Sequence, residues 1–152
     1  MLAGWLSRFA ALAMAALVAA CAAPPAPPPP TSVALTINTA PDANSGLPAR
    51  VQVYYLSSVA GFQGADYFAL SDDAQATLGA DLVAADQYLM SPASTQSDGK
   101  SFDRAVTHIG VVVGFRDIST AAWRATMPLT PNAPNPVAVE VGANSVSLAA
   151  GQ

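Results

Sequence analysis

Apolar residues alternate with small or polar residues along several short segments of this chain. This is the pattern of half-buried β-strands, because successive side chains of a strand point to opposite faces of the sheet. Such segments, several of them rich in β-branched or aromatic residues, predict about seven strands. They are residues 33–38, 51–56, 82–90, 108–115, 123–129, 137–141 and 145–149. We expect the strand over 108–115 to be central in its sheet, since Ile109, Val111, Val113 and Phe115 share one face.

The pattern changes between the second and third of these strands. Ala65, Phe68 and Ala69 recur at helical spacing, which predicts a short helix over 64–70. A further turn or two is expected to follow, and the whole helical insert then spans about residues 64–78. We expect this insert to cover an edge or an end of the sheets.

Capping residues support the second part of the insert. Ser71 is a candidate N-cap, and Gly79 is a candidate C-terminal stop. Asp72 and Asp73 would lie at the positive end of the helix dipole. The same two residues are also a candidate pair of carboxylates for acid–base or metal chemistry, but adjacent helix residues point in different directions, so capping is the favoured interpretation.

The first twenty residues have the layout of a secretory signal peptide. One basic residue, Arg8, precedes an apolar run over 9–20, and this run is shorter than the ~20 residues that a membrane-spanning helix needs. Residues 17–21, Leu-Val-Ala-Ala-Cys, resemble the bacterial lipobox, in which the cysteine is lipidated and becomes the new N-terminus. The alternative is an ordinary signal peptide cleaved near Ala19.

Cys21 is the only cysteine, so it has no disulfide partner within the chain. We therefore predict that Cys21 carries a lipid. Ala22 follows it, whereas an Asp there would resemble the signal for retention at the inner membrane, so the outer membrane is favoured. Residues 21–30 then form a Pro-rich tether of polyproline II character.

Residues 31–150 are expected to form one domain, because their length suits a single hydrophobic core and their composition shows no internal break. Many short strands with Pro and Gly between them predict a mainly β fold, a sandwich of seven to eight strands. Ten acidic residues face five basic ones once Arg8 is removed, which argues against nucleic acid as a partner.

Catalytic and metal-binding patterns are weak in this sequence. His108 is the only histidine and lies at the start of an apolar strand, so a structural role is favoured over a catalytic one. Zinc would need three or four converging ligands. Arg116 and Asp117 are a candidate anion site, but opposite charges at a strand end usually form a solvated or locally paired turn. The residues therefore predict no enzyme, no metal and no cofactor.

Several segments taken together resemble the type VI secretion system outer-membrane lipoproteins, the TssJ (SciN-like) family. They are Ala49-Arg-Val-Gln-Val-Tyr-Tyr-Leu56, Phe62 with Ala65-Asp-Tyr-Phe-Ala-Leu70, Asp72-Asp73 with Leu78-Gly-Ala-Asp-Leu82, Gly110-Val-Val-Val-Gly-Phe-Arg-Asp-Ile118, and Trp123-Arg124. These segments occur in the order and at the spacing of the family, and together they extend over most of the chain after the tether. The resemblance implies a transthyretin-like β-sandwich with an added helical element.

The resemblance also implies a function. Members of this family anchor the secretion system's membrane complex at the outer membrane by gripping the periplasmic part of an inner-membrane protein, TssM. The implied contact region is the loop between the first two strands, residues 39–48. Within this loop we expect a run of six contact residues, with Asp42 and Asn44 as the main polar contacts. The run is Pro41, Asp42, Ala43, Asn44, Ser45 and Gly46.

Other interpretations of this loop and of the chain stay open. Pro-Asp and Asn-Ser-Gly are turn formers, and a wide strand crossover alone would also explain a connection of this length. A periplasmic ligand-binding protein or an envelope-assembly adaptor is the alternative function, and a ligand carrier would need a deep apolar pocket with a few polar groups inside it. An envelope hydrolase would need a second histidine or a convincing carboxylate pair.

Overall fold

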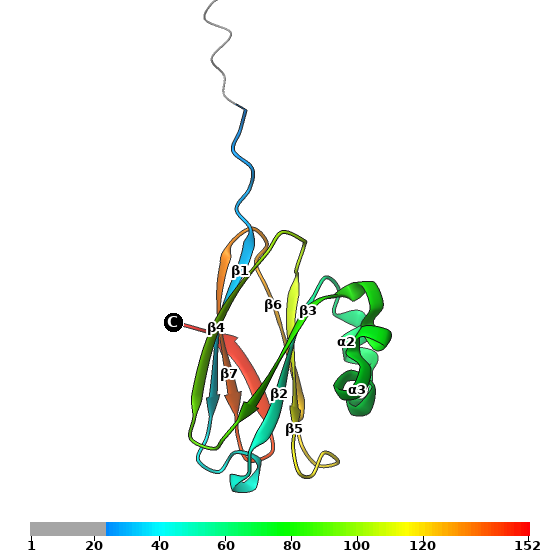
Figure 1. The fold of residues 1–152 in the computed structure, drawn as a ribbon, viewed down its shortest axis with the longest axis vertical. Coiled ribbons are helices and arrows are strands. Elements are labelled where there is room, and N and C mark those ends of the chain that lie inside the picture. The colour runs from blue at the N-terminus through cyan, green and yellow to red at the C-terminus, as the bar shows by residue number, and fades with distance from the viewer. Residues whose placement is uncertain (1–23) are drawn as a thin grey trace, which may run out of the picture.

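A computed structural model describes residues 24–152, and these form a β-sandwich with a helical insert on one side (Figure 1). Eight strands make two four-stranded sheets, in the orders β4-β1-β7-β8 and β3-β2-β5-β6. The strands are β1 (Thr31–Thr39), β2 (Ala49–Leu56), β3 (Leu82–Met90), β4 (Thr95–Phe102), β5 (His108–Gly114), β6 (Arg124–Pro128), β7 (Pro134–Val141) and β8 (Val146–Ala150). The predicted mainly β sandwich of seven to eight strands is therefore confirmed.

The core lies between the two sheets and is built by the alternating residues. Val33, Leu35 and Ile37 of β1 are at most 2 % exposed and face the equally buried Val51 and Val53 of β2. In β5 the predicted inward face is confirmed, and β5 pairs with β2 on one side and β6 on the other, so it is a central strand. The side chains of the two sheets thus fill the space between them. No helix among the described residues is long and apolar enough to cross a membrane.

Strand β4 is missing from the sequence-based prediction. Its residues, Thr-Gln-Ser-Asp-Gly-Lys-Ser-Phe, show no apolar alternation, and only Phe102 at its end is buried. β4 forms because its backbone pairs in antiparallel fashion with residues Thr31–Asn38 of β1. The other side of β4 lies at the edge of the sheet. An edge strand of this kind needs few apolar side chains, so periodicity cannot detect it.

The insert begins earlier than predicted and is capped differently. It consists of α2 (Ala60–Gly64) and α3 (Tyr67–Leu78), and a single 3-10 turn, η3 (Gly79–Asp81), follows. Ser71 is not an N-cap, since it lies inside α3. Asp66 caps α3 by accepting a hydrogen bond from the Ala69 amide at 3.0 Å, and Gly79 ends it as expected, with a φ of 56°.

Asp73 takes the capping function that was predicted for Ser71. Its φ of −147° interrupts α3, and its carboxylate accepts a hydrogen bond from the amide of Ala76 at 3.0 Å. The second half of α3 therefore starts afresh at this residue, as an N-cap permits. The prediction that these carboxylates serve as helix caps is confirmed for Asp73.

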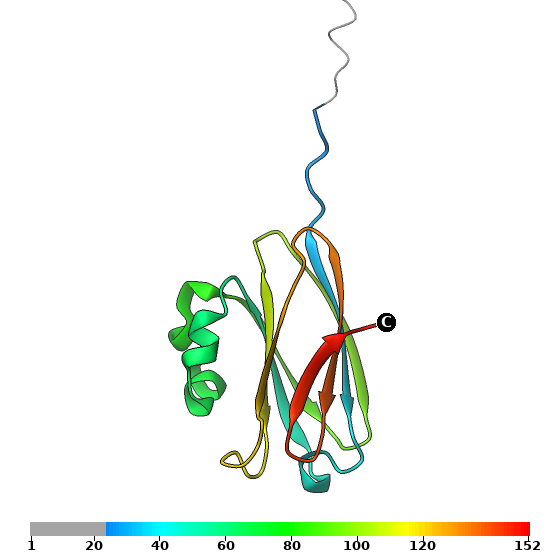
Figure 2. The same ribbon diagram turned by 180° about the vertical axis from the view of Figure 1, so that it is seen from behind.

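The insert covers the outer face of the sheet β3-β2-β5-β6, not an edge or an end as predicted (Figures 1 and 2). A second cluster of buried residues joins the two layers, with Tyr54 and Val112 from the sheet and Phe62, Leu70 and Leu78 from the insert. The Tyr54 hydroxyl donates a 2.8 Å hydrogen bond to the Leu70 carbonyl. The strand β2 is therefore buried on both faces toward its end, over Val53–Leu56. A strand of this kind can pack against the other sheet with one face and against a helix with the other.

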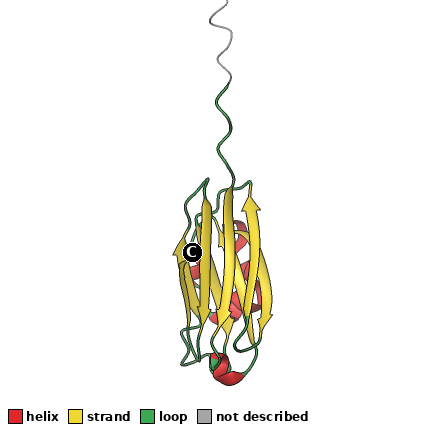
Figure 3. Ribbon diagram, turned by 90° about the vertical axis from the view of Figure 1, so that its left-hand side faces the viewer, coloured by secondary structure: helices red, strands yellow, loops and turns green. Residues whose placement is uncertain are grey.

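The sandwich has two distinct ends. The tether enters at one end, beside the connections 103–107 and 129–133 (Figures 1 and 2). At the opposite end, which we call the distal end, lie the connections β1–β2, β3–β4, β5–β6 and β7–β8. Figure 3 shows the 3-10 turn η2 (Ala43–Gly46) of the β1–β2 connection at this distal end. Anything that holds the tether therefore presents the distal end away from the point of attachment.

Candidate partner-binding site

The six predicted contact residues all lie at the distal end, in the connection between β1 and β2. Four of them, Pro41, Asp42, Ser45 and Gly46, are exposed. Ala43 and Asn44 are buried, with 1 % and 5 % of their surface accessible. The side chain of Asn44 points into the protein in the free domain, so its function as a polar contact stays a prediction, and the exposed Asp42 is the more accessible of the two polar residues.

Asn44 ties the loop to its surroundings. Its side-chain Nδ2 donates to the Pro48 carbonyl at 2.9 Å, and its Oδ1 accepts a hydrogen bond from the Arg116 amide at 2.7 Å. Its own backbone amide donates to the carbonyl of Gly142 at 3.2 Å. One buried side chain and its amide therefore join the β1–β2, β5–β6 and β7–β8 connections, which sequence reasoning treated as separate loops.

The backbone of this turn is left-handed at three successive residues. Asn44, Ser45 and Gly46 have φ values of 48°, 58° and 81°. Glycine adopts this region freely and asparagine better than most residues, but serine pays a steric cost of order 1 kcal/mol. The run Asn-Ser-Gly thus has a structural reason for its composition, and the hydrogen bonds of Asn44 hold the strained turn in place.

Two further loops surround the predicted contact loop and form a shallow hollow with it. Asn44 and Ser45 line this hollow together with Phe115, Arg116 and Asp117 of the β5–β6 connection and Ala143 and Asn144 of the β7–β8 connection. Its volume is about 220 Å³. Sequence reasoning missed this grouping. The only feature of the sequence that pointed to this hollow was the charged pair Arg116-Asp117, which directly follows an apolar strand.

Asp117 organises the β5–β6 connection. Its carboxylate accepts hydrogen bonds from the Ser119 hydroxyl at 2.6 Å and from the Thr120 hydroxyl at 2.9 Å. The hydrogen bond from the Ser119 hydroxyl, followed by that from Thr120, lowers the pKa of Asp117. Asp117 therefore serves its own turn, while the neighbouring Arg116 side chain is exposed beside the hollow.

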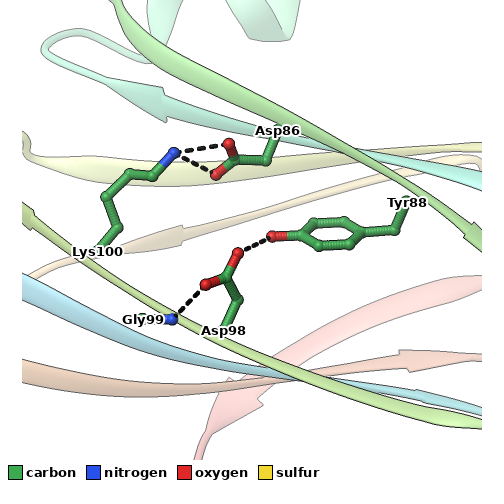
Figure 4. Close-up of polar contacts among 5 residues, drawn as sticks. All are labelled: Asp86, Tyr88, Asp98, Gly99 and Lys100. Carbon is green, nitrogen blue, oxygen red and sulfur yellow. Dashed lines mark hydrogen bonds and ion pairs between the residues drawn. The ribbon is translucent and has the colours of Figure 1, made fainter.

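A polar clip holds the open side of the sandwich, where the edge strands β3 and β4 face each other without pairing. Lys100 of β4 donates to both carboxylate oxygens of Asp86 of β3 at 2.6 Å, and the Tyr88 hydroxyl donates to Asp98 at 2.7 Å (Figure 4). The hydrogen bond from Tyr88 lowers the pKa of Asp98. Inward-pointing charges on edge strands also discourage pairing with another chain. We therefore interpret this cluster as a structural contact between β3 and β4.

Because three tyrosines have raised pKa values, we predict that the free energy of unfolding falls at alkaline pH. Burial raises the pKa of Tyr54 from 10.0 to about 12, and burial also raises the pKa of Tyr55 and Tyr88. The folded chain then keeps protons that the unfolded chain loses above pH ~10, so stability is full below that pH and falls as the pH rises towards 12. Urea unfolding at neutral pH and at about pH 11, with tyrosinate absorbance recorded alongside, measures this loss. Ionisation of these tyrosines near pH 10 in the folded protein would contradict it.

The remaining candidates for chemistry are structural or lie outside the described residues. The Thr107 hydroxyl donates to the Ser57 carbonyl at 2.9 Å, and its oxygen lies 2.9 Å from the His108 Nδ1. Within residues 24–152 no group of three or more His, Cys, Asp or Glu side chains is placed to hold a metal ion. The proposed lipidation site Cys21 and the signal peptide over 1–20 precede the described part of the chain.

A family comparison decides what kind of protein carries this site. The family described as type VI secretion lipoprotein, with the members VasD, EvfM and TssJ, matches residues 31–144. The chain belongs to this family. The match begins at the first residue of β1 and ends in the β7–β8 connection, so it includes both sheets, the insert and the distal loops. Membership identifies a lipoprotein of the type VI secretion system with a β-sandwich domain. No curated protein is detectably similar to the chain.

Solved structures give the same result for the fold. The T6SS lipoprotein TssJ1 from Pseudomonas aeruginosa is 32 % identical, with a TM-score of 0.77, and the match covers 82 % of this chain and 98 % of TssJ1. Serratia marcescens Lip, a membrane-bound component of the type VI secretion system, is 22 % identical, with a TM-score of 0.71 over 78 % of this chain and 96 % of Lip.

A third similar chain comes from the structure of the T6SS protein TssM C-terminal domain from EAEC. It is 24 % identical, with a TM-score of 0.60, and the match covers 78 % of this chain and 97 % of that chain. Like Lip, it supports the fold alone. The predicted family and fold are confirmed by the family match and by TssJ1.

Proposed function

We propose that this protein is an outer-membrane lipoprotein that anchors the type VI secretion membrane complex by binding the periplasmic part of a TssM-like inner-membrane protein. The binding surface in this proposal is the distal end, formed by the exposed residues of the β1–β2 connection and the neighbouring β5–β6 connection. The lipid on Cys21 supplies the membrane attachment. No enzymatic step is part of this function, and the proposal requires no cofactor.

The observation that carries the proposal is the position of the tether relative to the loops. Residues 24–30 leave the domain at one end, and the β1–β2 connection lies at the other (Figures 1 and 3). Its exposed residues include Pro41, Asp42 and Ser45. A polyproline II segment rises ~3.1 Å per residue, so the tether holds the domain roughly 25–30 Å from the lipid. The distal end then faces away from the outer membrane, where a protein from the inner membrane would meet it.

The predicted lipidation can be tested at the mature N-terminus. We expect signal-peptide cleavage before Cys21 and acylation of that cysteine, because the lone thiol follows a lipobox-like Leu-Val-Ala-Ala and precedes the tether. Intact-mass spectrometry of the membrane-extracted protein measures both. Cys21→Ser should move the domain from the membrane to the soluble fraction. An unmodified cysteine, or cleavage at another bond, would contradict the prediction.

A matched pair of charge reversals tests where the partner binds. Asp42→Lys changes an exposed residue at the distal end, and Asp103→Lys makes the same change at the tether end. We expect Asp42→Lys to weaken binding about tenfold or more, since a few contacts usually carry most of an interface's energy and ~1.4 kcal/mol is a tenfold change in Kd. Asp103→Lys should leave the affinity unchanged.

The measurement is a calorimetric titration of the mature lipoprotein in detergent with the periplasmic segment of the TssM-like protein. Thermal melts of both variants show whether each is folded. Wild-type affinity for a folded Asp42→Lys variant, together with weakened binding of Asp103→Lys, would place the contact at the tether end and refute the proposed binding surface.

A further inference from the structure

An anchor carries tension between its lipid and its partner, and strand β1 connects the two ends of the domain at which that tension would act. The tether enters β1 at its first residue, Thr31, without an intervening turn (Figures 1 and 3). At Thr39 the strand leads into the β1–β2 connection at the distal end. Its nine residues span roughly 30 Å, since a strand rises ~3.3 Å per residue. β1 is therefore one extended path from the tether to the distal loops.

β1 is paired with a neighbouring strand on each side over nearly its whole length. Residues Thr31–Asn38 pair with β4 in the antiparallel direction, and residues Ser32–Thr39 pair with β7 in the parallel direction. The three inward hydrophobic side chains of β1 are at most 2 % exposed and belong to the core between the sheets. β1 therefore cannot slide along its own axis unless both ladders break and these side chains leave the core.

Buried polar contacts fix the start of β1, where the tether enters. Thr31 is 4 % exposed, and its Oγ1 accepts a hydrogen bond from the Asn132 amide at 2.8 Å. Asn135 is 9 % exposed and donates through Nδ2 to the Ser32 carbonyl at 3.2 Å and to the Thr130 carbonyl at 3.0 Å. Its Oδ1 accepts a hydrogen bond from the Thr130 amide at 2.7 Å. These bonds join the first residues of β1 to the connection that precedes β7.

The other end of β1 is fixed in a similar way. Thr39 is 7 % exposed, and its Oγ1 donates to the Ser91 carbonyl at 2.6 Å and accepts a hydrogen bond from the Ser94 amide at 2.9 Å. The next residue, Ala40, donates its amide to the carbonyl of Val141, the last residue of β7, at 2.9 Å. Both ends of β1 are therefore tied to neighbouring elements, and a force on either end passes into β4 and β7.

We propose that β1 and its two ladders are a load-bearing element, which carries tension between the lipid and the distal end while the domain stays folded. This inference rests on the proposed function, which sets the two points of load. Tension applied at opposite ends of the sandwich acts along the strand axis, so the strand pairs resist it side by side and must break together. Tension applied at one end alone separates the same pairs one after another. The domain therefore resists force better along β1 than at a single end.

Single-molecule pulling in two directions tests this property. The mature chain, residues 21–152, is produced without its signal peptide, so that Cys21, the only cysteine, keeps a free thiol as the first handle. The second handle is Ala143→Cys at the distal end or, as the matched control, Thr130→Cys at the tether end. Both positions are exposed and lie in the connections that flank β7. We expect the Ala143→Cys variant to unfold at a severalfold higher force than the Thr130→Cys variant.

Urea unfolding of both cysteine variants is the control for stability. Each should keep the wild-type free energy of unfolding, because substitutions of exposed loop residues usually change it little. Unfolding under force follows the barrier to unfolding and not the equilibrium between the folded and unfolded states. A difference in unfolding force between two equally stable variants therefore reports the direction of the load.

The outcomes separate this inference from the proposed function. Equal unfolding forces in the two directions, or a lower force for Ala143→Cys, would overturn the load-bearing element and leave the proposed partner binding untouched. Weakened binding of Asp103→Lys with wild-type affinity of Asp42→Lys would place the partner at the tether end. That result would overturn the proposed function and this inference together, because no tension would then cross β1.

Discussion

Gly110→Ala is expected to lower the free energy of unfolding by about 2 kcal/mol, as overpacking of a rigid interior does. A Cβ at this position would lie 2.8, 2.9 and 3.0 Å from three atoms of the Phe62 ring. Phe62 is 0 % exposed and packs against Tyr54 with ring centroids 5.7 Å apart, so the ring has no free space to enter. The added methyl group must push the insert away from the sheet.

Gly114→Ala is the matched control, because Gly114 lies on the same strand and the same face. A Cβ there would lie 2.9 Å from the Tyr67 hydroxyl, the end of a partly exposed side chain that can move. Replacing glycine in a strand also reduces the entropy lost on folding, which offsets part of the cost. We expect a change within about 1 kcal/mol for this variant. Urea unfolding of both proteins measures the difference, and equal losses would contradict the account of how the insert packs.

Asn44→Ala is expected to lower the free energy of unfolding by about 2–3 kcal/mol, through two effects. The change leaves the Arg116 amide and the Pro48 carbonyl without their side-chain partner in part-buried surroundings, and a polar group left unpaired on burial costs ~1–3 kcal/mol. It also places alanine at a φ of 48°, which glycine or asparagine tolerates better. Asp42→Ala, two residues earlier and exposed, should change stability by less than about 0.5 kcal/mol.

Asn44→Gly separates these two effects. Glycine adopts the left-handed conformation freely, so this variant loses only the hydrogen bonds and should be more stable than Asn44→Ala by roughly 1 kcal/mol. Denaturant titrations of the three variants give the comparison. If Asn44→Ala were as stable as Asp42→Ala, the side chain of Asn44 would not hold the three distal loops together.

The strands with inward apolar faces were predictable from the sequence because burial on one face produces an alternation of period two. Residues such as Val51, Val53, Ile109 and Val111 carry that signal directly, and the structure buries each of them. β4 carried no such signal, since its stability comes from backbone pairing with β1 and from its polar clip to β3. Exposed edge strands are therefore the elements that periodicity misses.

The sequence located the candidate loop between the first two strands, but it did not show which residues of that loop are exposed. The family resemblance located the loop between the first two strands, and the structure places that loop at the distal end. Which of its residues are exposed depends on contacts with residues far away in sequence, above all between Asn44 and Arg116. The space that Gly110 leaves for Phe62 has the same origin, since no local pattern shows which residue will pack on which glycine.

Hydrogen–deuterium exchange tests most directly that the protein holds its partner by the end opposite the tether. The mature lipoprotein in detergent is compared with and without the periplasmic segment of the TssM-like protein. The account predicts slower exchange over residues 40–48 and 115–118, and unchanged exchange over 103–107 and 129–133. Slower exchange confined to these last two connections would mean that the partner binds beside the tether and would contradict the account.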